Sequence, residues 1–309
     1  MGCVKVGVVG VGSWGKNIVR ALKELESEGL VKLVGVADAN PDLAADVARA
    51  HGVTEYVRTV GDLVRLGVEA VAISVPIDRL FHVAKDALSL GLHTFIEKPV
   101  STSSDEVREL MRIAENASLI AQPGFIVRYD PVSNVLKDFL TQRRVKYAIL
   151  KRLSARPTHR RGHSITLDLM IHDIDLALNL VGVQEVRVLS AVGFKMEFGI
   201  PQEVHALLTL GKTLVYLVTD GTLPVKVRVA EIVTEDSYCE VSYTDSTVLV
   251  RSGEGSYVRR ASGEEPLKAE LRDFVRSVEG VRSPRAPTLQ DALRALTVVE
   301  LINEKLNRV

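Results

Sequence analysis

The stretch Val4–Gly15, VKVGVVGVGSWG, decides the fold of the first part of the chain. Apolar residues typical of a buried strand run into a glycine loop, and a helical pattern follows the loop. The first glycine permits a tight turn, the second lets a pyrophosphate approach the backbone, and the third lets helix and strand pack closely. Unpaired N–H groups at the helix start favour an anion. The stretch predicts a dinucleotide site, with a purely structural turn as the alternative, formed by Gly10, Gly12, Ser13, Trp14 and Gly15.

Length and composition limit the classes of protein that this chain can form. Its 309 residues, 46% of them hydrophobic, suffice for two domains with sizeable cores. Lys plus Arg equals Asp plus Glu at 39 each, which argues against nucleic acid or a membrane surface as the main partner. No apolar run approaches the roughly 20 residues that span a bilayer. The cysteines, Cys3 and Cys239, suggest neither a disulfide framework nor a metal site, so we expect a cytoplasmic protein without a metal.

A βα rhythm follows the glycine loop. A helical pattern over Asn17–Glu28 precedes the strand Val31–Ala37, and further strands near Tyr56, at Ala70–Val75 and at His93–Glu97 alternate with helices. Continuous apolar strands separated by helices predict a doubly wound parallel sheet, a Rossmann domain. Ligands of such sheets bind at the carboxyl ends of the strands. The residues expected there, besides the loop, are Asp38, Ser74, Val75, Pro76, Glu97 and Lys98.

Asp38 follows the second strand, about twenty residues beyond the loop. A carboxylate there can accept both ribose hydroxyls of an adenosine and would repel a 2′-phosphate, so we expect NAD rather than NADP. The alternative is an N-cap for the helix that begins at Pro41, although Asn40 could fill that position.

Glu97-Lys98-Pro99 directly follows an apolar strand. It can be read as a charged strand cap in which Pro99 prevents extension. Alternatively, the Lys98 ammonium points toward the nicotinamide end of a bound dinucleotide and lowers the pKa of a substrate hydroxyl. The sequence leaves open whether the Lys98–Pro99 bond is cis.

An apolar helix is expected over Thr166–Val181, and it carries one polar stripe. Asp168, His172, Asp175 and Asn179 recur at helical spacing, so they share one face. Such a stripe either faces water or lines a cleft.

The segment Arg156–His163 precedes this helix and is rich in cationic side chains. It can be a solvated surface loop, or it can clamp an anionic part of a substrate, because arginine forks suit phosphates. The side chains concerned are Arg156, His159, Arg160, Arg161 and His163.

From Glu185 to about Arg260 the apolar residues alternate, and no helical pattern intervenes. This predicts a large open antiparallel sheet, an α+β domain when backed by helices, with two final helices near Pro266–Glu279 and Thr288–Leu306. With a boundary near Gln122-Pro123, the expected domains are residues 1–122, which bind the dinucleotide, and residues 123–309, which bind the substrate and mediate oligomerisation.

Together these motifs resemble the glucose–fructose oxidoreductase/inositol dehydrogenase (Gfo/Idh/MocA) family. The resemblance covers nearly the whole chain. It rests on the glycine loop, Asp38, the SVP…H spacing of Ser74–Pro76 and His82, Glu97-Lys98-Pro99, Gly124-Phe125 and Arg128-Tyr129-Asp130-Pro131.

The resemblance implies roles for three residues. The family's EKP lysine is catalytic, so Lys98 inherits that role. Asp168 and His172 match an Asp and a His four residues apart on a helix under the nicotinamide. His172 would then be the general base, with an unperturbed pKa of about 6.5, and Asp168 would position the substrate. Asp173 and Asp175 would orient neighbouring groups. The family often has glycines before the Asp, whereas this chain has His163–Leu167, HSITL, which changes the pocket.

The resemblance further implies an NAD(P)-dependent dehydrogenase that acts on CH–OH groups. The expected reaction moves a hydride between the nicotinamide and a secondary hydroxyl of a sugar, cyclitol or nucleotide sugar. The TLDLMIHDIDL run is similar to nucleotide-sugar members, UDP-N-acetylglucosamine 3-dehydrogenase-like. The alternatives are an NADPH-dependent keto-sugar reductase and a redox-inactive NAD-binding sensor or regulatory protein. Family members cover the open sheet by self-association, so a homodimer or homotetramer is expected. The candidate substrate contacts are Arg128, Tyr129, Arg156, Arg160, Arg161 and His163.

Overall fold

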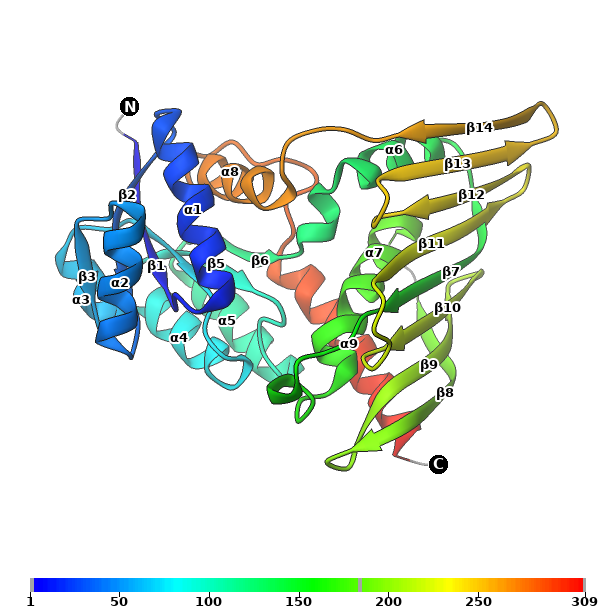
Figure 1. Ribbon diagram of the computed structural model, residues 1–309, viewed down its shortest axis with the longest axis horizontal. Helices are drawn as coiled ribbons and strands as arrows, with labels where there is room; N and C mark the ends of the chain where they lie inside the picture. Colours follow the sequence, from blue (N-terminus) through cyan, green and yellow to red (C-terminus); the bar gives the residue numbers. More distant parts are fainter. Residues whose placement is uncertain (1–2, 183–184, 308–309) are drawn as a thin grey trace. The chain divides into compact units, whose positions relative to one another are not determined.

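The computed structural model describes residues 3–182 and 185–307, without the side chain of His159. The chain forms two compact units (Figure 1). The first comprises Met1–Ile126 and Glu265–Leu293, and the second comprises Val127–Glu264 and Arg294–Val309.

The first unit is built on a parallel sheet of six strands in the order β3-β2-β1-β4-β5-β6. The chain order reverses between β1 and β4, which is where doubly wound sheets bind ligands. The predicted Rossmann fold is therefore confirmed. The strands are β1 (Val4–Val9), β2 (Val31–Ala37), β3 (Glu55–Val57), β4 (Ala70–Ile73), β5 (His93–Glu97) and β6 (Ala121–Gly124).

Helices connect these strands, and local capping fixes where several of them begin. The Asn40 side chain accepts from the backbone N–H groups of Asp42 and Leu43 at the start of α2, next to Pro41 at the first helical position. Thr59 and Asp62 form a reciprocal capping box at α3. The helices are α1 (Ser13–Ser27), α2 (Pro41–His51), α3 (Val60–Arg65), α4 (Ile77–Ser89) and α5 (Ser104–Asn116).

Helix α8 (Pro266–Val278) also belongs to the first unit, so the predicted assignment of all of residues 123–309 to the second domain needs correction. Leu267, Leu271, Phe274 and Val275 lie in the same buried cluster as β1, α1 and β2. The Phe274 ring lies 5.9 Å from that of Phe95, centroid to centroid. The apolar face of α8 thus finds its partner in the first sheet, and the first segment ends at residue 126 rather than 122.

The second unit contains a sheet of eight strands in the order β14-β13-β12-β11-β7-β10-β9-β8. All neighbouring pairs are antiparallel except β7 and β10. The predicted large sheet is confirmed, but it is mixed, because the overlooked strand Val145–Leu153 inserts beside β10. The strands are β7 (Val145–Leu153), β8 (Val186–Glu197), β9 (Ile200–Leu210), β10 (Thr213–Asp220), β11 (Val227–Thr234), β12 (Ser237–Ser242), β13 (Thr247–Ser252) and β14 (Gly255–Arg260).

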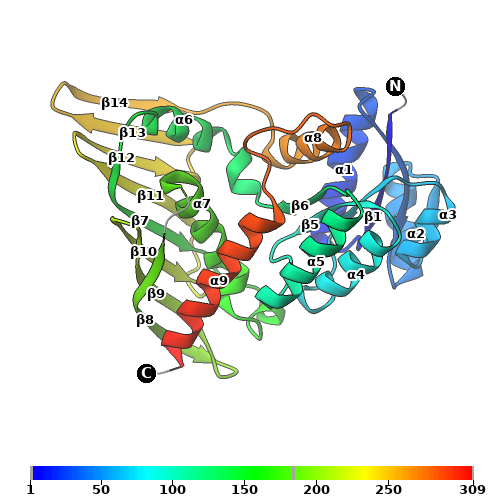
Figure 2. The same cartoon turned by 180° about the vertical axis from the view of Figure 1, so that it is seen from behind.

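Helices cover one face of this sheet, as Figure 2 shows for α6, α7 and the later part of α9. Along β9 the alternate residues from Gln202 to Leu210 are buried, whereas Glu203, His205 and Leu207 on the other face are partly exposed. The helical elements are η1 (Ile126–Tyr129), α6 (Pro131–Leu140), η2 (Thr158–Arg160), η3 (Thr166–Met170), α7 (Ile171–Val181) and α9 (Leu289–Leu306), the last belonging to this unit from Arg294 on.

The described part of the chain has neither a membrane-spanning helix nor a cluster of metal-binding side chains. None of its helices is long and apolar enough to cross a bilayer. Across residues 3–182 and 185–307, no group of His, Cys, Asp or Glu side chains could hold a metal ion.

Candidate functional site

The glycine loop between β1 and α1 has two glycines that packing requires and one that leaves space. Gly10 has φ of +83°, and a Cβ there would lie 2.4 Å from the Ser74 carbonyl oxygen. A Cβ at Gly15 would lie 2.0 Å from the Gly10 carbonyl oxygen. A Cβ at Gly12 would meet no atom within 4 Å. Gly12 immediately precedes α1, whose first turn has no side-chain cap, so this helix start can accept an anion.

Asp38 is held beside this loop by both of its carboxylate oxygens. The Val11 backbone N–H donates to Oδ2 at 2.9 Å, and the Asn40 N–H donates to Oδ1 at 2.9 Å. Asn40 caps α2, so Asp38 does not serve as that cap. The carboxylate therefore lies at the carboxyl end of β2, next to the loop.

The end of β4 packs against the same loop. The Ser74 backbone N–H donates to the Val9 carbonyl oxygen at 2.8 Å, and Val75 borders the space beside Gly10. Pro76 then directs the chain into α4. Ser74 and Val75 thus border the loop, and Pro76 follows them at the start of α4.

Trp14 and Glu97 connect the loop to the end of β5. The Trp14 indole N–H donates to Glu97 Oε1 at 2.6 Å, although the sequence gives no sign of this contact. Burial raises the pKa of the Glu97 carboxyl to about 7, opposed by the Trp14 hydrogen bond and the Lys98 charge. Lys98 is half-buried, and the Lys98–Pro99 peptide bond is cis.

In the second unit, the predicted α-helix over Thr166–Val181 begins instead as a π-helix, Thr166–Met170, and continues as α7. A π turn takes an additional residue and is frequent at functional sites. The helical period therefore changes between Asp168 and His172, so the α-helical spacing behind the predicted stripe holds only from Ile171 on. Asp168 is buried and His172 is half-buried.

Three aspartates of this helical segment form buried ion pairs with arginines. Arg152 binds Asp173 through two bonds of 2.7 and 2.9 Å. Arg128 binds Asp175 through two bonds of 2.5 and 2.9 Å. The Arg156 Nε lies 3.0 Å from Asp168 Oδ2, and burial lowers the pKa of Arg156 while Asp168 opposes that shift. Asp173 and Asp175 thus anchor the helix.

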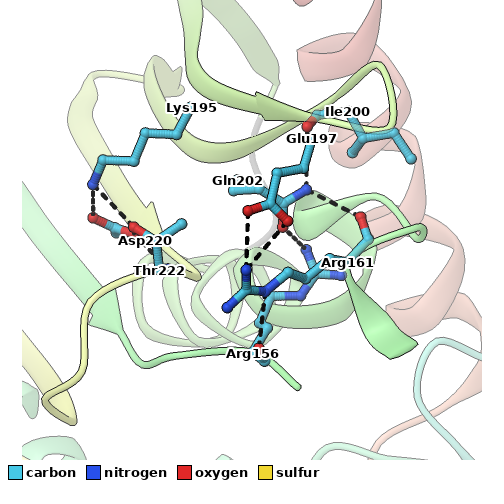
Figure 3. Close-up of polar contacts among 8 residues, drawn as sticks. All are labelled: Arg156, Arg161, Lys195, Glu197, Ile200, Gln202, Asp220 and Thr222. Atoms are coloured by element: carbon cyan, nitrogen blue, oxygen red, sulfur yellow. Dashed lines mark hydrogen bonds and ion pairs between the residues drawn. The ribbon is translucent and has the colours of Figure 1, made fainter. Parts of the chain in front are cut away.

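The cationic segment before the helix is tied into the fold by polar contacts that Figure 3 shows. Arg161 pairs with Glu197 of β8 at 2.9 Å, and its Nε donates to the Arg156 carbonyl oxygen. The buried Gln202 amide donates to the carbonyl oxygens of Arg161 and Ile200. Arg156 and Arg161 thus have partners within the protein, and Arg160 lies 3.8 Å from Asp168. Arg160 and His163 are exposed.

The remaining candidate substrate contacts, Arg128 and Tyr129, are also held within the fold, and two residues of this region were not predicted. Arg128 is engaged by Asp175, and Tyr129 is buried. Arg152 was missed because β7 was not recognised, although its apolar run Tyr147–Leu150 could have revealed the strand. No sequence pattern indicates Gln202, whose contacts join segments far apart in the chain.

Comparisons with known proteins agree with this arrangement. Residues 4–125 match the family model described as "Oxidoreductase family, NAD-binding Rossmann fold", GFO_IDH_MocA. The chain is 28% identical over 292 residues to UDP-N-acetylglucosamine 3-dehydrogenase of Acidithiobacillus ferrooxidans, covering 90% of each. The family match thus covers residues 4–125 of the first unit, as a Gfo/Idh/MocA-type NAD-binding domain.

Solved structures extend the likeness to the second unit. A solved structure of the Acidithiobacillus ferrooxidans dehydrogenase has a TM-score of 0.91 at 26% identity, covering 100% of this chain and 99% of that one. Inositol 2-dehydrogenase of Rhizobium meliloti is 27% identical over 193 residues, 60% of this chain and 57% of that protein. Levoglucosan dehydrogenase in complex with NADH has a TM-score of 0.89 at 18% identity, over 99% of this chain and 97% of that one, which shows a shared fold. The protein is thus an oxidoreductase with an NAD-binding Rossmann unit, and the fold of its second unit is shared with the Acidithiobacillus ferrooxidans dehydrogenase.

Proposed function

We propose that the protein is an NAD-dependent dehydrogenase that oxidises a secondary hydroxyl of a sugar, cyclitol or nucleotide sugar. The observation that carries this proposal is the attachment of Asp38 to the Val11 N–H, because it fixes a carboxylate beside an uncapped helix start. That arrangement suits the ribose and pyrophosphate of NAD, and the carboxylate would repel the 2′-phosphate of NADP. Bound dinucleotide would supply the hydride acceptor.

Lys98, His172 and Asp168 are the proposed catalytic residues. The Lys98 ammonium would donate a hydrogen bond to the substrate hydroxyl and lower its pKa. His172 would take the hydroxyl proton as the hydride leaves the neighbouring carbon. Asp168, held by Arg156, would hold the substrate in place. The Ser74–Pro76 turn and Glu97 would border the nicotinamide end of the dinucleotide.

The substrate class that we propose is a nucleotide sugar. The relative from Acidithiobacillus ferrooxidans carries the name of an enzyme for such a substrate, and it covers nearly the whole chain. The exposed Arg160 adds positive charge just before the catalytic helix, and the exposed His163 lies in the same segment. A free cyclitol is the competing substrate, as named for the inositol dehydrogenase relative.

The test is a substrate panel of nucleotide sugars, sugars and cyclitols, followed through nicotinamide absorbance with NAD and with NADP. We expect turnover of a nucleotide sugar with NAD. Reduction of keto-sugars by NADPH alone would identify the reductase alternative. Tight NADH binding without turnover of any compound would identify a sensor.

Variants at the catalytic positions test the proposed roles. Lys98→Ala and His172→Ala should each lower kcat by about 10²–10⁴-fold, as loss of a general acid or base does, while NADH affinity stays nearly unchanged. Lys32→Ala, an exposed lysine of β2, is the control and should retain wild-type rates. Wild-type kcat in either catalytic variant would refute the assignment.

We also propose self-association, as a homodimer or homotetramer, through the open face of the second sheet. Apolar side chains gather there, and Phe194, Leu214 and Tyr147 are 50%, 41% and 42% exposed. Such patches mark interaction surfaces. Light scattering coupled to gel filtration should report a dimer or tetramer, and Phe194→Lys should shift it toward the monomer.

A further inference from the structure

Among the residues that the structure describes, Arg228 forms no ion pair with a carboxylate, whereas neighbouring arginines do. Arg128, Arg152 and Arg156 are each buried and each paired with a carboxylate of the helical segment η3–α7. Burying a guanidinium is costly unless an anion compensates its charge, so these pairings are what physical chemistry requires. Arg228, on β11, stands beside the same helix and lacks such a partner.

The position of Arg228 follows from the register of the sheet. It lies directly opposite Arg152 in the antiparallel pair of β11 and β7. Side chains alternate between the two faces of a strand. Arg152 lies two residues from buried Leu150, and Arg228 lies two and four residues from buried Ala230 and Ile232, so both arginines lie on the face that the helices cover. Two like charges placed opposite each other destabilise a sheet.

Nearby groups compensate the positive charge of Arg228 only in part. In residues 3–182 and 185–307 its buried Nε has no hydrogen-bond partner, and no carboxylate forms an ion pair with its guanidinium. Asp173 is engaged by Arg152, and the Asp130 carboxylate caps α6 through the Val132 N–H. Burial and the charge of Arg152 lower the pKa of Arg228, and the smaller contributions of the Asp173 and Asp130 charges oppose that shift.

Lys226 adds to this excess of positive charge. It lies two residues before Arg228 and is exposed. The charge of Arg228 lowers the pKa of Lys226, with smaller contributions from burial and Arg152. A cluster of cations that repel one another and border solvent favours a bound anion.

We propose that Arg228 and Lys226 form an anion-binding subsite that takes a phosphate or carboxylate group of the substrate. A planar guanidinium binds either group through two parallel hydrogen bonds, and the neighbouring ammonium adds a point charge. The cluster adjoins α7 at Asp173, the residue after His172. The assignment of the anion to the substrate rests on the proposed function, and it narrows the substrate to an acidic one.

Direct binding of two probes tests the subsite without turnover. Inorganic pyrophosphate and glucuronate are titrated calorimetrically into the full chain with saturating NADH, which occupies the glycine loop. We expect saturable binding of at least one probe to the wild type, and the tighter probe identifies the group as phosphate or carboxylate. Absence of saturable binding of both probes would overturn the proposal.

Variants then locate the binding. Arg228→Gln should weaken the better probe by about tenfold or more, the loss typical of a hydrogen bond to a charged group, and Arg228→Lys should weaken it less. Arg259→Gln is the matched control on exposed β14 and should bind like the wild type. Equal affinity in Arg228→Gln and the wild type would refute the subsite.

Thermal unfolding separates binding from a structural role. Without anion, Arg228→Gln should have a Tm equal to or above that of the wild type, because a repulsive charge opposite Arg152 is removed. The wild type should gain Tm on adding the better probe, whereas the variant should not. A lower Tm of the anion-free variant would make Arg228 a structural residue and refute the proposal. Probe binding without any hydride transfer would instead refute only the proposed function.

Discussion

Trp14 donates to Glu97 across the carboxyl ends of β1 and β5, so a residue of the phosphate loop touches the residue before Lys98. Trp14 is the sole tryptophan of the chain, which makes its fluorescence an unambiguous probe of this contact. The pKa of Glu97 is about 7, raised from 4.5 by burial, so its carboxyl is protonated in the folded protein over a range where it is ionised in the unfolded one. Folding therefore binds a proton at Glu97 between these values.

The sign of the effect follows from that proton. The contribution of Glu97 to the free energy of unfolding is greatest below pH 4.5 and declines as pH rises toward 7. Tryptophan emission should titrate with a midpoint near 7, and Glu97→Gln should abolish the transition. Glu69→Gln, in the same unit, is the control and should keep it. A transition that persists in Glu97→Gln would show that Trp14 senses another group.

Residues whose role depends on their neighbours in the chain could be predicted from the sequence. Gly10, Gly15 and the cap at Asn40 follow from local backbone needs, and the structure confirms them. The Trp14–Glu97 contact joins residues 83 positions apart, so only the folded sheet brings it about. Arg152 and Arg228 likewise meet only through strand register.

At the scale of the element, the strand–loop–helix unit separates two functions of glycine. Gly15→Ala should destabilise the protein strongly, because its Cβ would lie 2.0 Å from a backbone oxygen that cannot move aside cheaply. Gly12→Ala should keep the wild-type Tm, since the space there is open, but should weaken NADH binding where the pyrophosphate approaches. Thermal unfolding and NADH titration of both variants check this. Equal loss of Tm in both would contradict it.

The helical segment η3–α7 is held by buried ion pairs. Removing one partner of a pair should lower the free energy of unfolding more than replacing both partners by apolar residues. Arg152→Met leaves Asp173 buried without its partner and should lower the free energy of unfolding by about 3 kcal/mol, the range for a broken buried pair. The double variant Arg152→Met/Asp173→Leu should recover most of that loss. Urea unfolding measures both. A double variant less stable than Arg152→Met would contradict this, because removing the unpaired Asp173 charge would then not restore stability.

These ion pairs also explain why the predicted polar stripe did not reveal the role of each of its residues. Helical spacing identified Asp168, His172 and Asp175 as polar residues on an apolar helix, but it could not distinguish a catalytic group from an anchor. That distinction depends on arginines of β7 and of the segments before and after β7. The sequence does not show that these arginines pack against the helix. The π turn also escapes prediction, because hydrophobic periodicity assumes a constant helical period.

At the scale of the whole molecule, the return of α8 to the first unit makes that unit discontinuous in sequence. Its composition and position after the second sheet suggest membership of the second domain, and only the match of its apolar face to the first core shows otherwise. Leu267, Leu271, Phe274 and Val275 are almost fully buried there. At about 1.5–3 kcal/mol for each side chain, their burial amounts to roughly 6–12 kcal/mol, comparable with the whole stability of a domain.

A fragment of residues 1–126 should therefore fail to fold cooperatively, although it includes every strand of the first sheet. Joining residues 265–293 to it through a flexible Gly/Ser linker should restore a cooperative thermal transition and NADH binding. The control is the same fusion with Leu271→Ala and Phe274→Ala, which should lose several kcal/mol of stability because it leaves cavities in the core. Circular dichroism and NADH titration of the three proteins measure these outcomes. Cooperative unfolding of residues 1–126 alone, at the Tm of the fusion, would show that α8 only covers a core that is already complete.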